Sequence, residues 1–149
     1  MIAMMIQFIV SMIATISFAI LFNAPKKEVL FCGLTGAFGW MIYYLITAQD
    51  ISNVLASMIA AFGLTLLSRI LAVARQNPVT VYLLTGIFPL VPGAGIYYTA
   101  YYLFTGENAL SGAKCLETLY IAGAIVFGII FGFGIPQALF RHLTPKNKA

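Results

Sequence analysis

The sequence predicts an all-α membrane protein with five transmembrane helices, the fourth broken at a Pro/Gly-rich segment near the middle of the bilayer. Three observations predict this fold class. Hydrophobic residues make up 62% of the 149 residues and charged residues only 8%, against roughly a quarter in a soluble domain. The mean hydropathy is +0.99, and the apolar residues form five long runs. The fourth run contains two prolines and two glycines within seven residues.

Each apolar run is close to or longer than the roughly 20 residues that a helix needs to cross a bilayer. Short polar segments with turn-forming residues separate the runs. The predicted spans cover residues 2–21, 29–47, 51–74, 79–104 and 116–140. We therefore expect a single transmembrane domain over residues 1–143, followed by a polar tail over 144–149.

The charged residues predict the orientation of the chain, because Lys and Arg accumulate on cytoplasmic loops. Basic residues stand at the first turn, the third turn and the C-terminus, whereas acidic residues stand at the second and fourth turns. Only Glu28 and Lys114 break this alternation. The pattern places the N-terminus outside and the C-terminus in the cytoplasm.

The sequence lacks the residue groups that an enzyme or a metal site requires. Cys32 and Cys115 lack metal-ligand spacing, and the predicted topology puts them at opposite faces of the membrane. His142 stands beyond the fifth span. The net charge of +4 follows from topology, since no basic stretch is long enough to bind nucleic acid. We expect no enzymatic activity, no metal and no cofactor.

The segment from Phe88 to Tyr98 cannot form a regular helix, because Pro89, Pro92, Gly93 and Gly95 interrupt it. The flanking half-helices would be about 15 Å and 13 Å long, so the break falls near the middle of a hydrocarbon core of about 30 Å. Irregular backbone at that depth requires protein cover or a polar cavity. The N-terminus of the second half-helix could hold a carboxylate. The alternative is a proline kink covered by neighbouring helices.

Arg69 places a charge inside the third apolar run, about 9 Å deeper than Arg75. Such a charge costs on the order of 1–3 kcal/mol unless it reaches the lipid headgroups or finds a partner. One interpretation is that the side chain extends to the cytoplasmic headgroups. The other is that Ser68 and Arg69 face a polar vestibule and attract anionic substrate from the cytoplasm.

Small residues at helical spacing predict where helices pack closely. They are Gly33, Gly36 and Gly39 in the second span, Ala56 and Ala60 in the third, and Gly128 and Gly132 in the fifth. Packing within one chain is the main interpretation. An oligomer contact through Gly128 and Gly132 is the alternative.

Several short motifs follow one another along nearly the whole chain. They are Phe22-Asn23-Ala24-Pro25, Cys32 with Gly33, Gly36 and Gly39, Ser68-Arg69, Pro89-Leu90-Val91-Pro92-Gly93, and Ile135-Pro136. In order and spacing they resemble the small YjjB-type subunit of the threonine/serine exporter family. The resemblance implies an inner (plasma) membrane exporter of small carboxylate-bearing metabolites, such as threonine, serine or succinate, and a larger YjjP-type partner subunit.

We therefore expect a subunit of a secondary exporter that works by alternating access around the broken fourth helix. The predicted substrate-binding residues are Pro89, Pro92, Gly93, Gly95, Tyr97, Ser68 and Arg69. If transport is proton-coupled, a partner would supply the intramembrane acid. The main alternative is a non-transporting membrane scaffold or assembly subunit. A passive channel is disfavoured, because the first and fifth spans offer few polar residues to line a pore.

Overall fold

The computed structural model describes residues 2–136, and over these residues every regular element is helical. The elements are α1 (Ile2–Leu21), α2 (Val29–Thr47), α3 (Asn53–Arg75), α4 (Val79–Gly86), the short 3₁₀ helix η1 (Phe88–Leu90), α5 (Gly93–Phe104) and α6 (Asn108–Gly134). The predicted end of the fifth span near Phe140, His142 and the polar tail at 144–149 lie outside the described residues.

Four helices, α1, α2, α3 and α6, are long and apolar enough to cross a bilayer. The segment from Val79 to Leu90 and the helix α5 pass the same test of length and composition together and are bent by 48° at the break, which gives up to five spans when this bent pair counts as one. Large apolar side chains such as Ile13, Val126 and Phe131 are exposed on the outside, as on a lipid-facing surface. The predicted fold class is confirmed, and the chain is a multi-pass membrane protein.

The last helix begins earlier than the predicted fifth span. It begins at Asn108 instead of Leu116, so Lys114 and Glu117 lie inside a helix and not in a loop. It ends at Gly134, because Ile135 is extended in front of Pro136, as expected for a residue that precedes proline. A boundary drawn by hydropathy stops at charged residues, whereas the hydrogen bonds of a helix continue through them.

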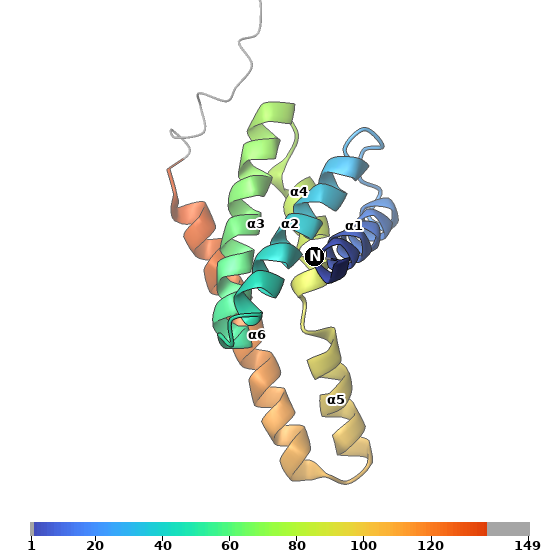
Figure 1. Cartoon of the computed structure of the whole chain (residues 1–149), viewed down its shortest axis with the longest axis vertical. Helices are drawn as coiled ribbons and strands as arrows, with labels where there is room; N and C mark the ends of the chain where they lie inside the picture. Colours follow the sequence, from blue (N-terminus) through green and yellow to red (C-terminus); the bar gives the residue numbers. More distant parts are fainter. Residues whose placement is uncertain (1, 137–149) are drawn as a thin grey trace, which may run out of the picture.

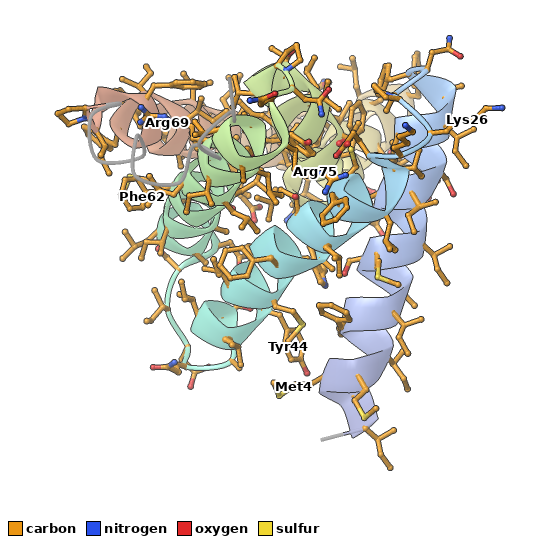
Figure 2. The ribbon with its side chains drawn as sticks, turned by 90° about the horizontal axis from the view of Figure 1, so that it is seen from above. Met4, Lys26, Tyr44, Phe62, Arg69 and Arg75 are labelled. Atoms are coloured by element: carbon orange, nitrogen blue, oxygen red, sulfur yellow. The ribbon has the colours of Figure 1, made fainter. Side chains whose placement is uncertain are left out.

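Helix α2 lies at the centre of the bundle, with α1 on one side and α3 and α4 on the other (Figure 2). Its small residues allow this close packing. A Cβ atom at Gly36 would collide with the Thr15 side chain of α1, and one at Gly39 would lie 2.8 Å from Leu64 of α3. The small residues of the second span therefore pack against helices of the same chain, as predicted.

Helices α3 and α6 lie side by side and run in the same direction (Figure 1). Gly128 faces the Met58 carbonyl and Ala61, and one turn later Gly132 faces Thr65. Both glycines are buried. This corrects the oligomer alternative: α3 of the same chain occupies the Gly128/Gly132 face, which is not open to a second copy.

Helix α5 and the first part of α6 form a hairpin that projects beyond the other helices (Figure 1). None of the α5 residues is buried. At the turn of the hairpin, Gly106 adopts a φ of +83°, a conformation that side chains rarely allow. The break in the fourth span therefore lies where this hairpin joins the rest of the bundle.

Candidate functional site

The break between α4 and α5 consists of three conformations in sequence. Helix α4 ends at Gly86, and residues Phe88–Leu90 form a single 3₁₀ turn. Val91 is then extended, with φ −61° and ψ 128°, because Pro92 follows it. Helix α5 begins at Gly93. In its first turn the Gly93 N–H donates to the Val91 carbonyl at 2.8 Å and the Ile96 N–H to the Pro92 carbonyl at 3.1 Å, which leaves the N–H groups of Ala94 and Gly95 without a backbone acceptor. The prolines thus cause the break that the sequence predicts.

A cavity of about 330 Å³ borders the break. Its walls come from four places in the fold: the end of α2, the start of α3, the break itself with α5, and the first half of α6. The lining residues are Trp40, Tyr43, Ser57, Pro89, Leu90, Val91, Pro92, Gly93, Ala94, Gly95, Tyr98, Lys114, Glu117, Thr118 and Ile121. Irregular backbone at the break is therefore bordered by a partly polar space as well as by packed side chains.

Four predicted site residues, Pro89, Pro92, Gly93 and Gly95, line this cavity together. The two glycines differ in their surroundings. A Cβ atom at Gly93 would meet nothing within 4 Å, whereas one at Gly95 would collide with the Thr118 hydroxyl of α6. Gly93 thus leaves space at the helix start, and Gly95 allows α5 to approach α6.

The other three predicted residues lie away from the cavity lining. Tyr97 is 62% exposed on the outside of α5, where its ring lies near those of Tyr98 and Tyr101. Ser68 is fully buried, and its hydroxyl donates to the Leu64 carbonyl of its own helix. A part for these residues in substrate binding stays a prediction that the cavity geometry does not support.

Arg69 is buried and donates a hydrogen bond of 2.6 Å to the Gly132 carbonyl of α6. Its guanidinium also lies 5.7 Å from the ring centre of Phe133. Figure 2 shows the Arg69 side chain beside the end of α6. The positive charge therefore meets the end of a helix that carries partial negative charge. This partner within the chain differs from both sequence interpretations, the headgroups and the vestibule.

Lys114 and Glu117 are the charged residues among the described lining residues, and the sequence analysis missed them as part of the site. Lys114 Nζ pairs with Glu117 Oε2 at 2.7 Å on the cavity side of α6. The sequence signal was a basic residue that breaks the charge alternation, with an acid three positions later. The predicted span boundary at Leu116 hid it, since it assigned Lys114 to a loop.

Glu28, the other exception to the charge alternation, is also paired. Its carboxylate accepts hydrogen bonds from Arg75 Nε at 2.5 Å, from Arg75 Nη2 at 2.9 Å and from the Tyr82 hydroxyl at 2.7 Å. The Arg75 guanidinium lies 3.8 Å from the ring centre of Phe31 (Figure 2 labels Arg75). These contacts join α3 and α4 to the start of α2, at the end of the bundle away from the α5–α6 hairpin.

Glu28 is 4% exposed, so it is buried although it lies just before α2. The hydrogen bonds from Arg75 hold the pKa of Glu28 below its usual value; burial opposes this effect, and the Tyr82 hydroxyl reinforces it. In the sequence, Glu28 stands out only as an exception to the charge alternation, which does not reveal its burial.

The cavity lies beside the second half of α2 and the start of α3. Its lining takes Trp40 and Tyr43 from the second half of α2, and Ser57 from the first turns of α3. The position of the break within a bilayer stays a prediction. Chemically, the cavity combines aromatic walls, a helix N-terminus, one cation and one anion among its described lining residues, which suits a small polar metabolite better than a lipid.

Comparison with known proteins finds a matching family and several relatives. Residues 7–133 match the family model described as "Threonine/Serine exporter, ThrE". The chain is 26% identical to a "Probable threonine/serine exporter" of Mycobacterium tuberculosis, over 73% of this chain and 21% of that protein. It is 27% identical to the "Threonine/serine exporter" of Corynebacterium glutamicum, over 84% of this chain and 25% of that protein.

A third relative is an "Uncharacterized protein" of Haemophilus influenzae, 27% identical over 89% of this chain and 46% of that protein. The chain therefore matches a quarter or less of the two exporters and about half of this protein. No solved structure matches the chain.

Proposed function

This chain belongs to the threonine/serine exporter family, and on that premise we propose that it is the small subunit of a secondary transporter. The transporter exports small carboxylate-bearing metabolites, threonine and serine or a dicarboxylate such as succinate, across the inner (plasma) membrane. It works by alternating access around the cavity at the broken fourth span, together with a larger partner subunit.

The observation that carries this proposal is the coincidence of the helix break with the cavity. Transporters commonly place their substrate sites where interrupted helices leave backbone groups free and half-helix N-termini point at anionic groups. Here Pro92, Gly93 and the first turn of α5 border the cavity directly. A metabolite carboxylate placed there would reach the N–H groups of Ala94 and Gly95, which have no backbone acceptor, whereas those of Gly93 and Ile96 already donate to the Val91 and Pro92 carbonyls.

The lengths of the relatives support the partner subunit. Matched segments cover between 21% and 46% of the relatives, so those proteins contain a large region without a counterpart here. A second polypeptide could supply this region. The exposed α5–α6 hairpin leaves room for such a chain beside the cavity.

The proposed orientation places the N-terminus outside and the C-terminus in the cytoplasm, following the charge alternation. The third and fifth predicted spans should cross the membrane in the same direction, and the parallel packing of α3 and α6 agrees with this. Under this orientation, the Glu28–Arg75 contacts lie at the cytoplasmic end and the α5–α6 hairpin at the outer end.

The test measures export of labelled threonine, serine and succinate from cells that contain or lack this chain, each with and without the larger subunit. Export that requires both chains supports the proposal. Equal export with and without this chain contradicts it and favours a scaffold role. Expression of every variant is matched by immunoblotting of membranes.

Two substitutions at the break refine the test. A Cβ atom at Gly93 would meet nothing within 4 Å, so the protein should still fold with Gly93→Leu. The leucine side chain should reduce export because it fills space at the cavity. Leu83→Ile is a control on α4, because it conserves volume away from the cavity lining. If both Gly93→Leu and Pro92→Ala leave export unchanged, the break is not part of the substrate path.

A further inference from the structure

The cavity contains one feature that neither the helix break nor the family explains, the ion pair between Lys114 and Glu117. Both are residues of α6, three positions apart, and their charged atoms lie 2.7 Å apart. They are the charged residues among the described residues that line the cavity. Charged side chains within a membrane-length helix commonly mark a substrate path.

We propose that Lys114 and Glu117 together select a zwitterionic substrate, an α-amino acid, over a dicarboxylate. This inference rests on the proposed transport function, and it names the residues that decide the substrate class. When an amino acid is bound, its ammonium group pairs with the Glu117 carboxylate and its carboxylate pairs with Lys114. One internal ion pair is exchanged for two ion pairs to the ligand.

The exposure of the pair makes this exchange feasible. The Lys114 and Glu117 side chains are 42% and 46% exposed, so neither charge is enclosed by protein. Exposed ion pairs contribute little to stability. The pair can therefore open for a ligand without unfolding the helix that carries it.

The balance of charges in the cavity disfavours a dicarboxylate. One carboxylate of succinate could pair with Lys114, but the second would find no further basic side chain among the described lining residues. It would also lie near the Glu117 carboxylate, which repels it. An amino acid carries one charge of each sign and so complements the two charges of the cavity wall, Lys114 and Glu117.

The aromatic side chains of the cavity favour an ammonium group as well. Trp40 and Tyr43 line it, with ring centres 5.3 Å apart, and Tyr98 lines it from α5. Aromatic faces attract ammonium groups and repel carboxylates. Two independent features, the acid and the aromatic wall, therefore select for the positive group that dicarboxylates lack.

Trp40 provides a direct readout of binding, because it is the single tryptophan of the sequence and lines the cavity. The experiment titrates the full chain in lipid nanodiscs and follows tryptophan fluorescence. The probes are L-serine, L-threonine, succinate, N-acetyl-L-serine, which lacks the ammonium group, and L-serinamide, which lacks the carboxylate. Trp40→Phe establishes that the signal comes from this site.

We expect saturable binding of serine or threonine, and binding at least about tenfold weaker for succinate and for both serine derivatives. Glu117→Gln should weaken serine binding by on the order of tenfold and reduce the preference for serine over succinate. Glu117→Lys should shift the preference toward succinate, since it adds a second cation. Glu107→Gln removes an acid outside the cavity lining and should change nothing.

The double variant Lys114→Glu with Glu117→Lys keeps both charges and therefore should keep serine binding. It separates recognition of charge from damage to the helix. The inference is overturned if succinate binds as tightly as serine, if Glu117→Gln leaves the serine-to-succinate ratio unchanged, or if no probe gives a saturable signal. Export that still requires this chain would then leave the transport proposal standing without it.

Discussion

The Arg69 guanidinium donates a hydrogen bond of 2.6 Å to the carbonyl oxygen of Gly132, four residues before Pro136. In a continuing helix, the N–H of residue 136 would bind that carbonyl, but proline has no N–H to donate. Arg69 replaces the missing donor from a different helix. The buried charge of α3 thus has a physical reason in a proline just beyond the end of α6.

Replacing Arg69 with Leu should destabilise the protein by about 1–3 kcal/mol, because the Gly132 carbonyl loses its side-chain donor. Chemical or thermal unfolding in detergent measures the effect. Pro136→Ala restores an N–H at position 136, so the double variant should lose less stability than Arg69→Leu alone. An equal loss in both backgrounds would contradict the capping role, and a loss of export at unchanged stability would revive the anion-attracting role.

Stability at acid pH should depend on Glu28. The fold lowers the pKa of this carboxyl below its usual value of 4.5. The ionised carboxylate therefore stabilises the folded state relative to the unfolded state. The contribution is complete above pH 4.5 and is lost as the pH falls through the folded-state pKa. Melting temperature measured across this range should fall more steeply for the native protein than for Glu28→Gln. Identical pH profiles would rule out the contribution.

Replacing Tyr82 with Phe should cost about 1.5–3 kcal/mol, the usual value for a hydrogen bond to a charged group. The Tyr82 side chain is fully buried, and its hydroxyl donates to Glu28 at 2.7 Å. Tyr120→Phe, at a residue 63% exposed on α6, is the matched control and should be neutral. Equal unfolding energies for the two variants would show that the Tyr82 hydroxyl adds no stability.

Replacing Gly128 with Ala should destabilise the protein by about 1–3 kcal/mol through overpacking. The new methyl group would collide with the Met58 carbonyl, and backbone atoms of α3 can move only with the whole helix. Gly123→Ala on the same helix meets nothing within 4 Å, and it should be neutral or stabilising by up to about 1 kcal/mol. The difference between the two variants in unfolding energy measures how closely α3 and α6 must approach.

Much of the fold is local and could therefore be predicted. Helices α1 and α2 begin and end at the predicted residues, since apolar length and turn residues act within one segment. The break also appears where it was expected, because Pro89 and Pro92 act on their own backbone and on that of the preceding residue. The predicted fifth span starts eight residues after the observed start of α6, since hydropathy does not report helical hydrogen bonding.

Of the predicted site, the residues at the break lie together at one cavity, and Ser68, Arg69 and Tyr97 lie elsewhere. The first group are neighbours in sequence, so their proximity needs no tertiary information. In the second group, Ser68 donates to Leu64 of its own helix and Tyr97 lies near Tyr98 and Tyr101 of its own helix, whereas Arg69 has a partner in another helix. For Arg69 the partner is 63 residues away, at a distance over which apolar patterns carry no pairing information.

The sequence by itself determined the membrane class, the helical fold and the position of the broken helix, because each depends on the composition of one continuous segment. Only the tertiary structure decided which charges meet. It paired Glu28 with Arg75, gave Arg69 the Gly132 carbonyl and turned Lys114 and Glu117 toward the cavity. The physical reason is that a charge in an apolar surrounding takes the nearest partner in space, and helix packing sets which partner that is.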